Sequence, residues 1–344
     1  MKAKKVTLQL IADHLQVSKT LVSRALLGKY GVSEEMRQKI IQKAEELGYT
    51  FPAGQGGKPA ATRTNIIVTV IPRGYLGDQT YWGSLLEQIE SELQRAGYSM
   101  ILSPVSQSGD QELPSSIKNR QADGILLLGQ IAPELVLEIQ QSALPAVMVD
   151  GNPLSGAKLD HVLADNFVGM KDITTAVLES GHRRLAFIGS PAFSFSYAER
   201  WRGFRQAVDE FSLSRQTRID TQHIADIRGD HTILEVDHAL SALLQGSAPP
   251  TAIICANDAI AASLLFVLKS KNLRCPEDLT VTGFDNASAS EAHRLTTIDV
   301  VKQGLAWQAV NLLVQRIAGI SFNPCTLLVS GELMRRDSIF PMSQ

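Results

Sequence analysis

The chain has 344 residues, of which 44% are apolar and 20% charged, a composition that excludes a disordered chain and is typical of a protein with more than one core. Three scattered cysteines, Cys255, Cys275 and Cys325, are too few for a disulfide framework or a metal site, and we expect all three to be small core residues. The net charge is −2, yet residues 1–50 carry nine Lys and Arg against five acids, which makes this block +4 and the remainder −6. A small basic unit on a larger acidic body suggests that the small unit binds a polyanion.

The N-terminus and the most apolar run both argue against a membrane. "MKAKKVTLQL" passes from basic residues into an amphipathic pattern, without the apolar core or the cleavage site of a secretory signal. The run "AIAASLLFVL", residues 259–268, is too short to cross a bilayer and is expected to form a buried helix. We therefore expect a cytoplasmic protein without a membrane partner.

The first fifty residues contain three short runs with helical apolar spacing. Thr7, Ser18 and Ser33 precede these runs as N-cap residues, and a three-residue break separates the first two. This spacing is typical of a helix-turn-helix, whose second helix lies in the major groove of DNA. Its polar face could contact bases or phosphates, and a solvated face on a small helical bundle is the alternative. The polar residues are Lys19, Thr20, Ser23 and Arg24.

From residue 65 onward, apolar strands alternate with amphipathic helices. "NIIVTVIP", "GILLLG" and "PAVMVDG" belong to a first set, and "TAIICAND" and "LTVTGFDN" to a second. Continuous apolar strands separated by helices indicate parallel sheets covered on both faces. The sequence therefore predicts two α/β lobes that face each other across a cleft.

Polar residues follow several of these strands directly. Asp165 follows "HVLA", Asn257 follows "IICA", and Asp285 follows "VTGF". Ligands of open parallel sheets bind beyond the carboxyl ends of the strands, so these side chains could line a polar pocket. Each could equally be a helix cap or a turn residue.

Ordered sequence blocks carry a family resemblance along nearly the whole chain. "VSKTLVSRAL", "VSEE" and "ELGY" lie in the first fifty residues, and "ERWRGF", "ANDAIA", "LTVTGFDN" and "LTTIDV" follow in the body. In these blocks the chain resembles the LacI/GalR (lactose repressor) family of bacterial transcription regulators. The resemblance implies an α/β fold, with a three-helix helix-turn-helix headpiece and a two-lobed core like that of periplasmic binding proteins.

The resemblance also suggests how the chain is divided. We expect a DNA-binding headpiece at residues 1–50 and a flexible hinge or linker at 51–64. The N-terminal effector subdomain is expected at 65–163 and 291–322, and the C-terminal one at 164–290 and 323–344.

Site residues are implied at positions that match the family's motifs. For the effector, a small molecule in the cleft, they are Tyr81, Trp82, Asp165, Arg200, Asn257 and Asp285. Trp82 could stack on a sugar face or a base, or it could pack in the core. For DNA, the expected contacts lie in and around the helix-turn-helix and in the linker, where basic residues can follow the backbone or a narrow minor groove. They are Thr7, Ser18, Lys19, Thr20, Ser23, Arg24 and Lys29, with Lys58 and Arg63 in the linker.

Two departures from the family pattern bear on the DNA-binding unit. Gln16 stands where the family usually has the glycine of the turn, and a left-handed backbone there would be strained. The family's linker folds on DNA into a helix that inserts a leucine, whereas residues 51–64 hold Gly54, Gly56, Gly57 and Pro59 but no leucine. We expect this flexible linker to couple the lobes weakly to the headpiece.

Together these features predict a sequence-specific transcription regulator, a homodimeric repressor on a near-palindromic DNA operator. A sugar or polyol is the expected effector, and a purine or nucleoside or a protein co-effector is the alternative. A cytoplasmic sugar-binding or sugar-handling α/β protein is the alternative from another class. No HExxH, GxSxG or CxxC motif occurs, so we expect no enzyme activity, no metal and no cofactor.

Overall fold

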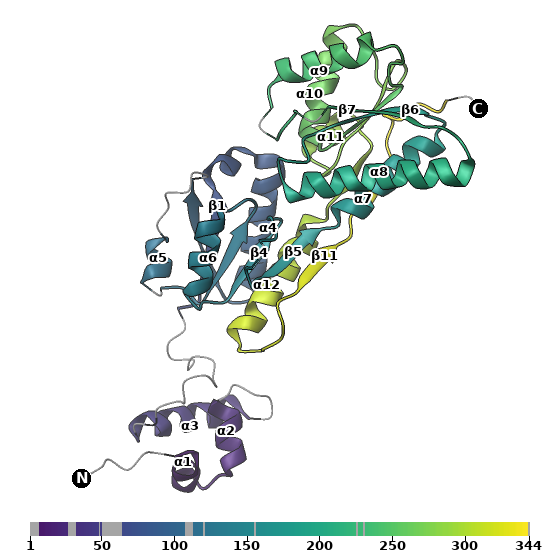
Figure 1. The fold of residues 1–344 in the computed structure, drawn as a ribbon. Helices are drawn as coiled ribbons and strands as arrows, with labels where there is room; N and C mark the ends of the chain where they lie inside the picture. The colour runs from purple at the N-terminus through teal and green to yellow at the C-terminus, as the bar shows by residue number, and fades with distance from the viewer. Residues whose placement is uncertain are drawn as a thin grey trace.

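The computed structural model describes residues 7–26, 32–47, 49, 64–106, 113–119, 121–154, 156–224, 226–229 and 231–342 (Figure 1). Three of the expected DNA contacts, Lys29, Lys58 and Arg63, lie outside the described residues, as does the linker segment 51–63. The described chain forms a three-helix headpiece and a core of two α/β lobes, each built on its own parallel sheet. This arrangement confirms the fold class that the sequence predicts.

The headpiece consists of α1 (Leu8–Leu15), α2 (Lys19–Leu26) and α3 (Glu34–Glu46). Each helix begins behind a hydroxyl that accepts a backbone N–H: Thr7 from Leu10 at 3.3 Å, Ser18 from Leu21 at 3.1 Å, and Ser33 from Met36 at 3.4 Å. Such caps satisfy N–H groups that have no partner within the helix. The three helices share a small core made of Ile11, Ala12, Val22, Ala25, Ile40 and Ala44.

The turn between α1 and α2 adopts the backbone that the sequence disfavours. Gln16 ends α1 with φ 54° and ψ 40°, a left-handed conformation. Its N–H and that of Val17 return to the carbonyls of Asp13 and Ala12, at 3.4 and 3.0 Å. These bonds satisfy the backbone at the end of the helix. A residue with a Cβ is nevertheless strained in the left-handed conformation, whereas the glycine usual in the family is not.

The first lobe is built on a six-stranded sheet in the order β11-β5-β4-β3-β1-β2, in which every neighbouring pair is parallel. Alternate residues of β1 enter opposite layers: Ile67 and Ile71 pack in the cluster that contains α4, and Val68 and Val70 in the cluster that contains α6. A strand that is buried on both faces has a nearly continuous apolar sequence, and the sequence of β1 is of this kind. The elements are β1 (Ile66–Pro72), β2 (Ser99–Val105), β3 (Gly124–Leu128), β4 (Ala146–Val149), β5 (Asp160–Ala164), β11 (Thr326–Val329), α4 (Ser84–Arg95), α5 (Ser115–Lys118), α6 (Pro133–Gln141) and α12 (Lys302–Ile317).

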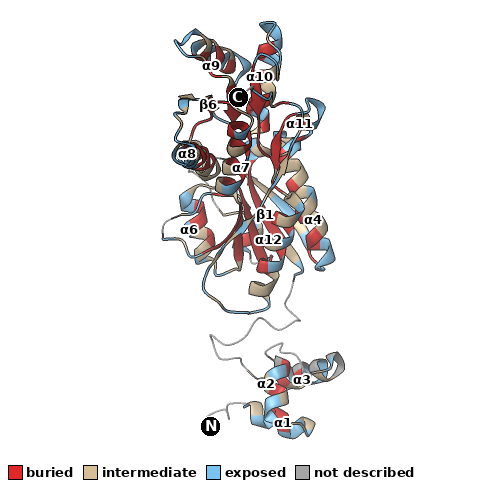
Figure 2. Cartoon of the chain, turned by 90° about the vertical axis from the view of Figure 1, so that its right-hand side faces the viewer, coloured by how far each residue is buried: buried red, intermediate tan, exposed pale blue. Residues whose placement is uncertain are grey.

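The second lobe is built on a four-stranded parallel sheet in the order β7-β6-β8-β9. Buried residues follow the strands of both sheets in Figure 2, so each lobe has its core on its own sheet. The elements are β6 (Arg184–Ile188), β7 (Asp220–Ile224), β8 (Ala252–Cys255), β9 (Thr280–Thr282), α7 (Asn166–Glu179), α8 (Phe195–Arg215), α9 (Ile233–Gln245), α10 (Asp258–Ser270) and α11 (Ser288–Ala292), with β10 (Thr297–Asp299) and β12 (Glu332–Met334) paired antiparallel beside it.

The strand pairing corrects the expected division of the chain in two places. Residues 323–344 are expected in the second lobe, but β11 pairs with β5 in the first sheet, from Thr326 beside His161 to Val329 beside Ala164. Residues 291–322 are expected in the first lobe, but β10, at 297–299, pairs with β12 beside the second sheet. The chain therefore passes between the lobes after β5, after β10 and after β11. A four-residue apolar strand has the same character in either sheet, so composition could not assign it.

The structure also tests what the sequence predicts about the burial of the cysteines and of the most apolar helix. Cys255 is fully buried in β8, but Cys275 and Cys325 are only half-buried, because they lie in connections rather than in strands. The helix expected at 259–268 is α10, yet it is buried on one face only and leaves Phe266 60% exposed. Among the described residues, no helix is both long and apolar enough to span a bilayer.

Candidate functional sites

A cavity of about 650 Å³ lies between the two lobes. Five of the six expected effector contacts line it: Tyr81 and Trp82 from the first lobe, and Arg200, Asn257 and Asp285 from the second. Residues that the sequence reasoning did not select complete the wall. They are Gly74, Tyr75, Asp78, Gln130, Asp150, Ser190, Ala192, Phe193, Ser194, Ser196, Tyr197, Arg228 and Gly229.

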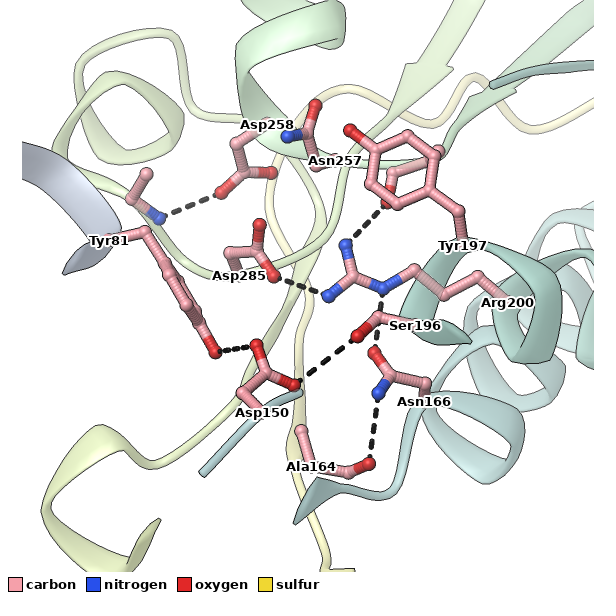
Figure 3. A network of polar contacts seen from close by, with 12 residues as sticks. Tyr81, Asp150, Ala164, Asn166, Ser196, Tyr197, Arg200, Asn257, Asp258 and Asp285 are labelled. Carbon is pink, nitrogen blue, oxygen red and sulfur yellow. Dashed lines mark hydrogen bonds and ion pairs between the residues drawn. The ribbon is translucent and has the colours of Figure 1, made fainter. Parts of the chain in front are cut away.

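Arg200, on α8, is the centre of a buried polar network (Figure 3). Its side chain is 4% exposed, and its three nitrogens donate to Asn166 Oδ1, the Ala256 carbonyl and Asp285 Oδ1, each at 2.8 Å. The guanidinium also lies over the Phe284 ring, 3.9 Å from its centroid. A buried charge with this many partners is held in one orientation, so Arg200 offers a preorganised positive group at the cavity floor.

Asp285 provides the opposite charge at the end of the strand that it follows. Its backbone is left-handed, with φ 107°, and its N–H donates to the Ile298 carbonyl at 2.9 Å. The Lys302 ammonium donates to the Asp285 carbonyl at 2.8 Å. Burial raises the pKa of Asp285 to about 6, although Arg200 and Lys302 act to lower it. A non-glycine residue held at positive φ in a ligand cavity is strain of the kind found at functional sites.

A second buried carboxylate, Asp258, stands behind this pair. Its two oxygens accept from the Ala287 N–H and from the Thr297 hydroxyl, both at 2.8 Å. Burial and the neighbouring charge of Asp285 raise the pKa of Asp258 to about 7. With pKa values of about 7 and about 6, Asp258 and Asp285 both change charge near neutral pH.

Asn257 has a divided role. Its Oδ1 accepts from the Ile260 N–H at 3.0 Å and so caps α10, which leaves its amide group as the part that can contact a ligand in the cavity. Asp165, by contrast, caps α7 by accepting from the Val168 N–H at 3.1 Å and is not among the residues that line the cavity. The structure therefore does not bring this sixth expected residue to the site.

The first lobe supplies an aromatic wall from an irregular segment. Residues 79–83 form a turn of π-helix, closed by a bond from the Gly83 N–H to the Asp78 carbonyl at 2.9 Å. Trp82 stacks on Tyr75, with ring centroids 4.5 Å apart and planes 13° apart. Trp82 thus both lines the cavity and packs against the core, so the two readings left open by the sequence are compatible.

Asp150, which the sequence reasoning missed, links the two walls. It follows β4 in a left-handed conformation, and its carboxylate accepts from the Tyr81 hydroxyl at 2.7 Å and from the Ser196 hydroxyl at 3.3 Å. A second bond between the lobes runs from the Gln130 amide to the Phe193 carbonyl at 2.6 Å. Asp150 obeys the strand-end rule that selected Asp285, so that rule could have found it.

The headpiece presents its polar helix face to solvent. Lys19, Thr20 and Arg24 are exposed on α2, and Ser23 is half-buried. Thr7 and Ser18 are occupied as caps, although both residues are exposed. Within the described part of the chain, no group of three or more His, Cys, Asp or Glu residues could hold a metal ion.

A helix-turn-helix unit joined to a two-lobed core with a polar cavity defines a DNA-binding regulator with a ligand-binding domain. Residues 7–51 match the model for bacterial regulatory proteins of the lacI family, and residues 174–339 match that for periplasmic binding protein-like domains. The chain is 30% identical to the HTH-type transcriptional repressor CytR of Escherichia coli (strain K12), over 98% of each chain. It belongs to the lacI family, and the relatives that it matches are transcription regulators rather than enzymes.

Solved structures agree with this assignment. A complex of the transcriptional regulator CelR with cellobiose matches with a TM-score of 0.66 and 26% identity, over 97% of this chain and 100% of that one. A lac repressor dimer bound to operator and the anti-inducer ONPF matches with a TM-score of 0.67 and 21% identity, over 98% and 100%. The second likeness bears on the fold alone.

Proposed function

We propose that this chain is a homodimeric repressor that reads a near-palindromic operator, and that a sugar or polyol in the inter-lobe cavity controls its affinity for DNA. The observation that carries the proposal is the convergence of Arg200, Asn257 and Asp285 on one cavity of about 650 Å³ between the lobes. A ligand that contacts both lobes stabilises one angle between them. It can alter DNA binding only through its different affinities for the two states.

The polar groups suit a ligand with several hydroxyls. Carboxylates such as Asp150 and Asp285 accept bonds from hydroxyls, and the amide of Asn257 donates to their oxygens. Trp82 offers a flat apolar surface on which a sugar ring can lie. Cellobiose bound to CelR, 26% identical to this chain, supports a carbohydrate in the same class of site.

A nucleoside is the second candidate, and one observation favours it. Tyr75 and Trp82 form a parallel stack at the cavity wall, and a planar base could continue this stack face to face. The ribose of a nucleoside would still present hydroxyls to the carboxylates. The two candidates are separated by the ligand screen described below.

Exposed apolar side chains support a dimer of two such chains. Phe266 on α10 is 60% exposed, and Leu234 on α9 is 62% exposed. Ile101 and Leu102 of the edge strand β2 are 39% and 38% exposed, beside α4. Such residues are costly in water and are typical of subunit interfaces. We infer that α10 and the α4–β2 edge each pair with the same surface of the second chain.

For DNA we propose contacts from α2 and its flanks. Lys19 and Arg24 can donate to guanine, and Thr20 and Ser23 can reach base edges or phosphates. Thr7 and Ser18, at helix starts, are placed for phosphate contacts. Lys29, Lys58 and Arg63 remain proposed contacts on the basis of the sequence.

The test of this function begins with a thermal-shift screen of sugars, polyols and nucleosides, because a ligand of the folded cavity raises the melting temperature by mass action. An operator is then selected from random DNA, and its release by the ligand is followed by fluorescence anisotropy. We expect Asp285→Asn to lose this response, because the uncharged amide accepts ligand hydroxyls less strongly than the carboxylate.

Asp165→Asn is the matched control for Asp285→Asn. The same change is made at a strand end, but Asp165 caps α7, and asparagine is an equally good cap. This variant should respond to the ligand as the wild type does. A wild-type response from Asp285→Asn, or a lost response from Asp165→Asn, would contradict the proposed site.

A further inference from the structure

One hydroxyl of the cavity wall has no hydrogen-bond partner within the described part of the chain. It belongs to Tyr197, whose side chain lines the cavity and is 5% exposed as a residue. The other cavity tyrosine treated above, Tyr81, donates to Asp150 at 2.7 Å. Buried hydroxyls are nearly always paired, because an unmade bond costs the full desolvation of the group.

The Tyr197 ring is fixed, so its hydroxyl cannot easily turn to another protein group. Tyr197 lies in the first turn of α8, where its N–H donates to the Ser194 cap at 3.2 Å. Phe193 packs edge-on against the ring, with centroids 5.1 Å apart, and the Arg200 guanidinium lies 5.8 Å from the ring centroid. Burial raises the pKa of Tyr197 well above its ordinary value, so the hydroxyl keeps its proton and can donate.

Asn257 also lines the cavity, and its amide group carries two hydrogens that can be donated. In Figure 3 the Tyr197 hydroxyl points toward the Asn257 side chain. Because Asn257 Oδ1 is occupied by the Ile260 N–H, the amide group is the part of Asn257 that remains for a ligand. An O–H and an N–H₂ group on one side of a cavity form a site for an acceptor atom.

The carboxylates of the cavity accept hydrogen bonds and therefore require donors on the ligand. Asp285 Oδ1 is held by Arg200, and its other oxygen is left to accept from a ligand, as are the remaining lone pairs of Asp150. A ligand that satisfies the whole cavity therefore carries hydroxyl donors on one side. On the other side it carries an acceptor, namely a carbonyl oxygen, a hydroxyl oxygen, a ring nitrogen or a ring oxygen.

We propose that Tyr197 is a specificity-determining residue, and that its hydroxyl, together with the amide of Asn257, binds one acceptor atom of the effector. This inference rests on the proposed function, because it takes the cavity as the effector site. A ligand with an oxygen or nitrogen lone pair at this place pairs the Tyr197 proton, whereas one with a methylene there leaves it unpaired. The cavity then discriminates between ligands that carry an acceptor at this place and those that do not.

The first test compares two removals of a hydroxyl in the ligand-free protein. Tyr81→Phe deletes a hydroxyl that has a partner and leaves an oxygen of Asp150 without its donor, so its melting temperature should fall. Tyr197→Phe deletes a hydroxyl without a partner, so its melting temperature should equal or exceed that of the wild type. A fall as large as that of Tyr81→Phe would show a structural partner for the Tyr197 hydroxyl and overturn the proposal.

The second test uses four probes, D-ribose, cellobiose, adenosine and uridine, in titration calorimetry of the full chain. For any probe that binds the wild type, Tyr197→Phe should weaken binding by about tenfold or more, because one hydrogen bond to a buried group is lost. Asp165→Asn, whose residue does not line the cavity, serves as the reference variant and should bind each probe as the wild type does. Wild-type affinity of Tyr197→Phe for every binding probe would overturn the proposal.

The two tests separate this inference from the function on which it rests. If none of the probes binds the wild type, the sugar-or-nucleoside form of the proposed function fails, and the comparison of Tyr197→Phe with Tyr81→Phe still decides whether the hydroxyl has a protein partner. If probes bind and release operator DNA but Tyr197→Phe changes neither affinity nor preference, the proposed function stands and the role of Tyr197 falls.

Discussion

The headpiece and the second lobe use charged side chains in opposite ways. On α2, Lys19 and Arg24 are exposed, and nothing but water has to be displaced when they meet DNA. In the second lobe, the side chains of Arg200 and Asp285 are only 4% and 11% exposed, and they are bound to each other and to the protein around them. The first arrangement is a surface available to a partner, and the second is a fixed part of the interior.

This difference predicts how each region tolerates change. An exposed charge can be removed with little effect on folding, because water solvates whatever remains. Removal of one member of a buried pair leaves the other charge unpaired in a medium where solvation is poor. Substitutions of the exposed charges on α2 should therefore affect DNA binding alone, whereas those in the buried network should affect stability and ligand response together.

The largest effect is expected at Arg200. Arg200→Ala removes the partner of Asp285 and the donors to Asn166 and Ala256, and should lower the free energy of unfolding by about 3–5 kcal/mol. Urea unfolding followed by circular dichroism measures this. The control is Arg218→Ala, since Arg218 is 90% exposed in its pair with Asp220 and should contribute about 0–1 kcal/mol. Equal losses of unfolding free energy in the two variants would contradict the expected difference between buried and exposed ion pairs.

The buried acids should give the second lobe a stability that depends on pH. Asp258 has its pKa raised by burial to about 7, so between pH 5 and pH 7 the folded state holds a proton that the unfolded state has released. Its contribution is therefore present at low pH and is lost as the pH rises through 7. Asp258→Asn removes this titration but keeps an oxygen for the Ala287 N–H, while the Thr297 hydroxyl can turn to accept from the new amide.

We expect the stability of Asp258→Asn relative to the wild type to improve between pH 5 and pH 8 by on the order of 2 kcal/mol. Burial lowers the pKa values of His161 and His182, which opposes this trend in the whole protein, but their effect cancels in the difference between variant and wild type. Urea unfolding of both proteins at pH 5, 6, 7 and 8 supplies that difference. A difference that does not change with pH would mean that Asp258 is ionised throughout this range.

On the exposed side of the comparison, Arg24→Ala tests whether α2 reads bases. If Arg24 grips a guanine, the variant should lose about 1–3 kcal/mol of specific operator binding and accept other bases at that position, with unchanged thermal stability. Binding to random DNA should fall much less. An equal loss on operator and random DNA would assign Arg24 to the phosphate backbone instead.

How much of the site the sequence could predict depends on which residues share a strand end. Asn257 and Asp285 follow apolar strands, and the carboxyl edge of a parallel sheet places them together. The same rule fails for Asp165. A residue at the end of a strand can cap the next helix instead of lining the cavity, and Asp165 caps α7. Asn257 does both, since its oxygen caps α10 and its amide is left for the cavity.

Other parts of the site depend on contacts between distant segments, which no local pattern encodes. Ser196, in the first turn of α8, contacts Asp150 of the first lobe, and Arg200, one turn on, bonds to Asp285 within the second lobe, 85 residues away. The spacing within α8 predicts a helix but not which of its residues meets the other lobe. For the same reason β11 could not be assigned, because a short apolar strand pairs with whichever sheet edge the chain returns to.

The smallest effect is expected at Gln16, where the headpiece departs from its family. Its backbone is left-handed, with φ 54°, and a glycine adopts that conformation without the strain of a Cβ. Gln16→Gly should raise the free energy of unfolding of the headpiece by roughly 0.5–1 kcal/mol, after the greater freedom of glycine in the unfolded chain is subtracted. Gln9→Gly, the same change inside α1, should instead lower it by about 1 kcal/mol. Because Gln16 is exposed and belongs to no buried network, thermal unfolding of the core should be unchanged in both variants, and a shift there would mean that the two regions are less independent than their charges imply.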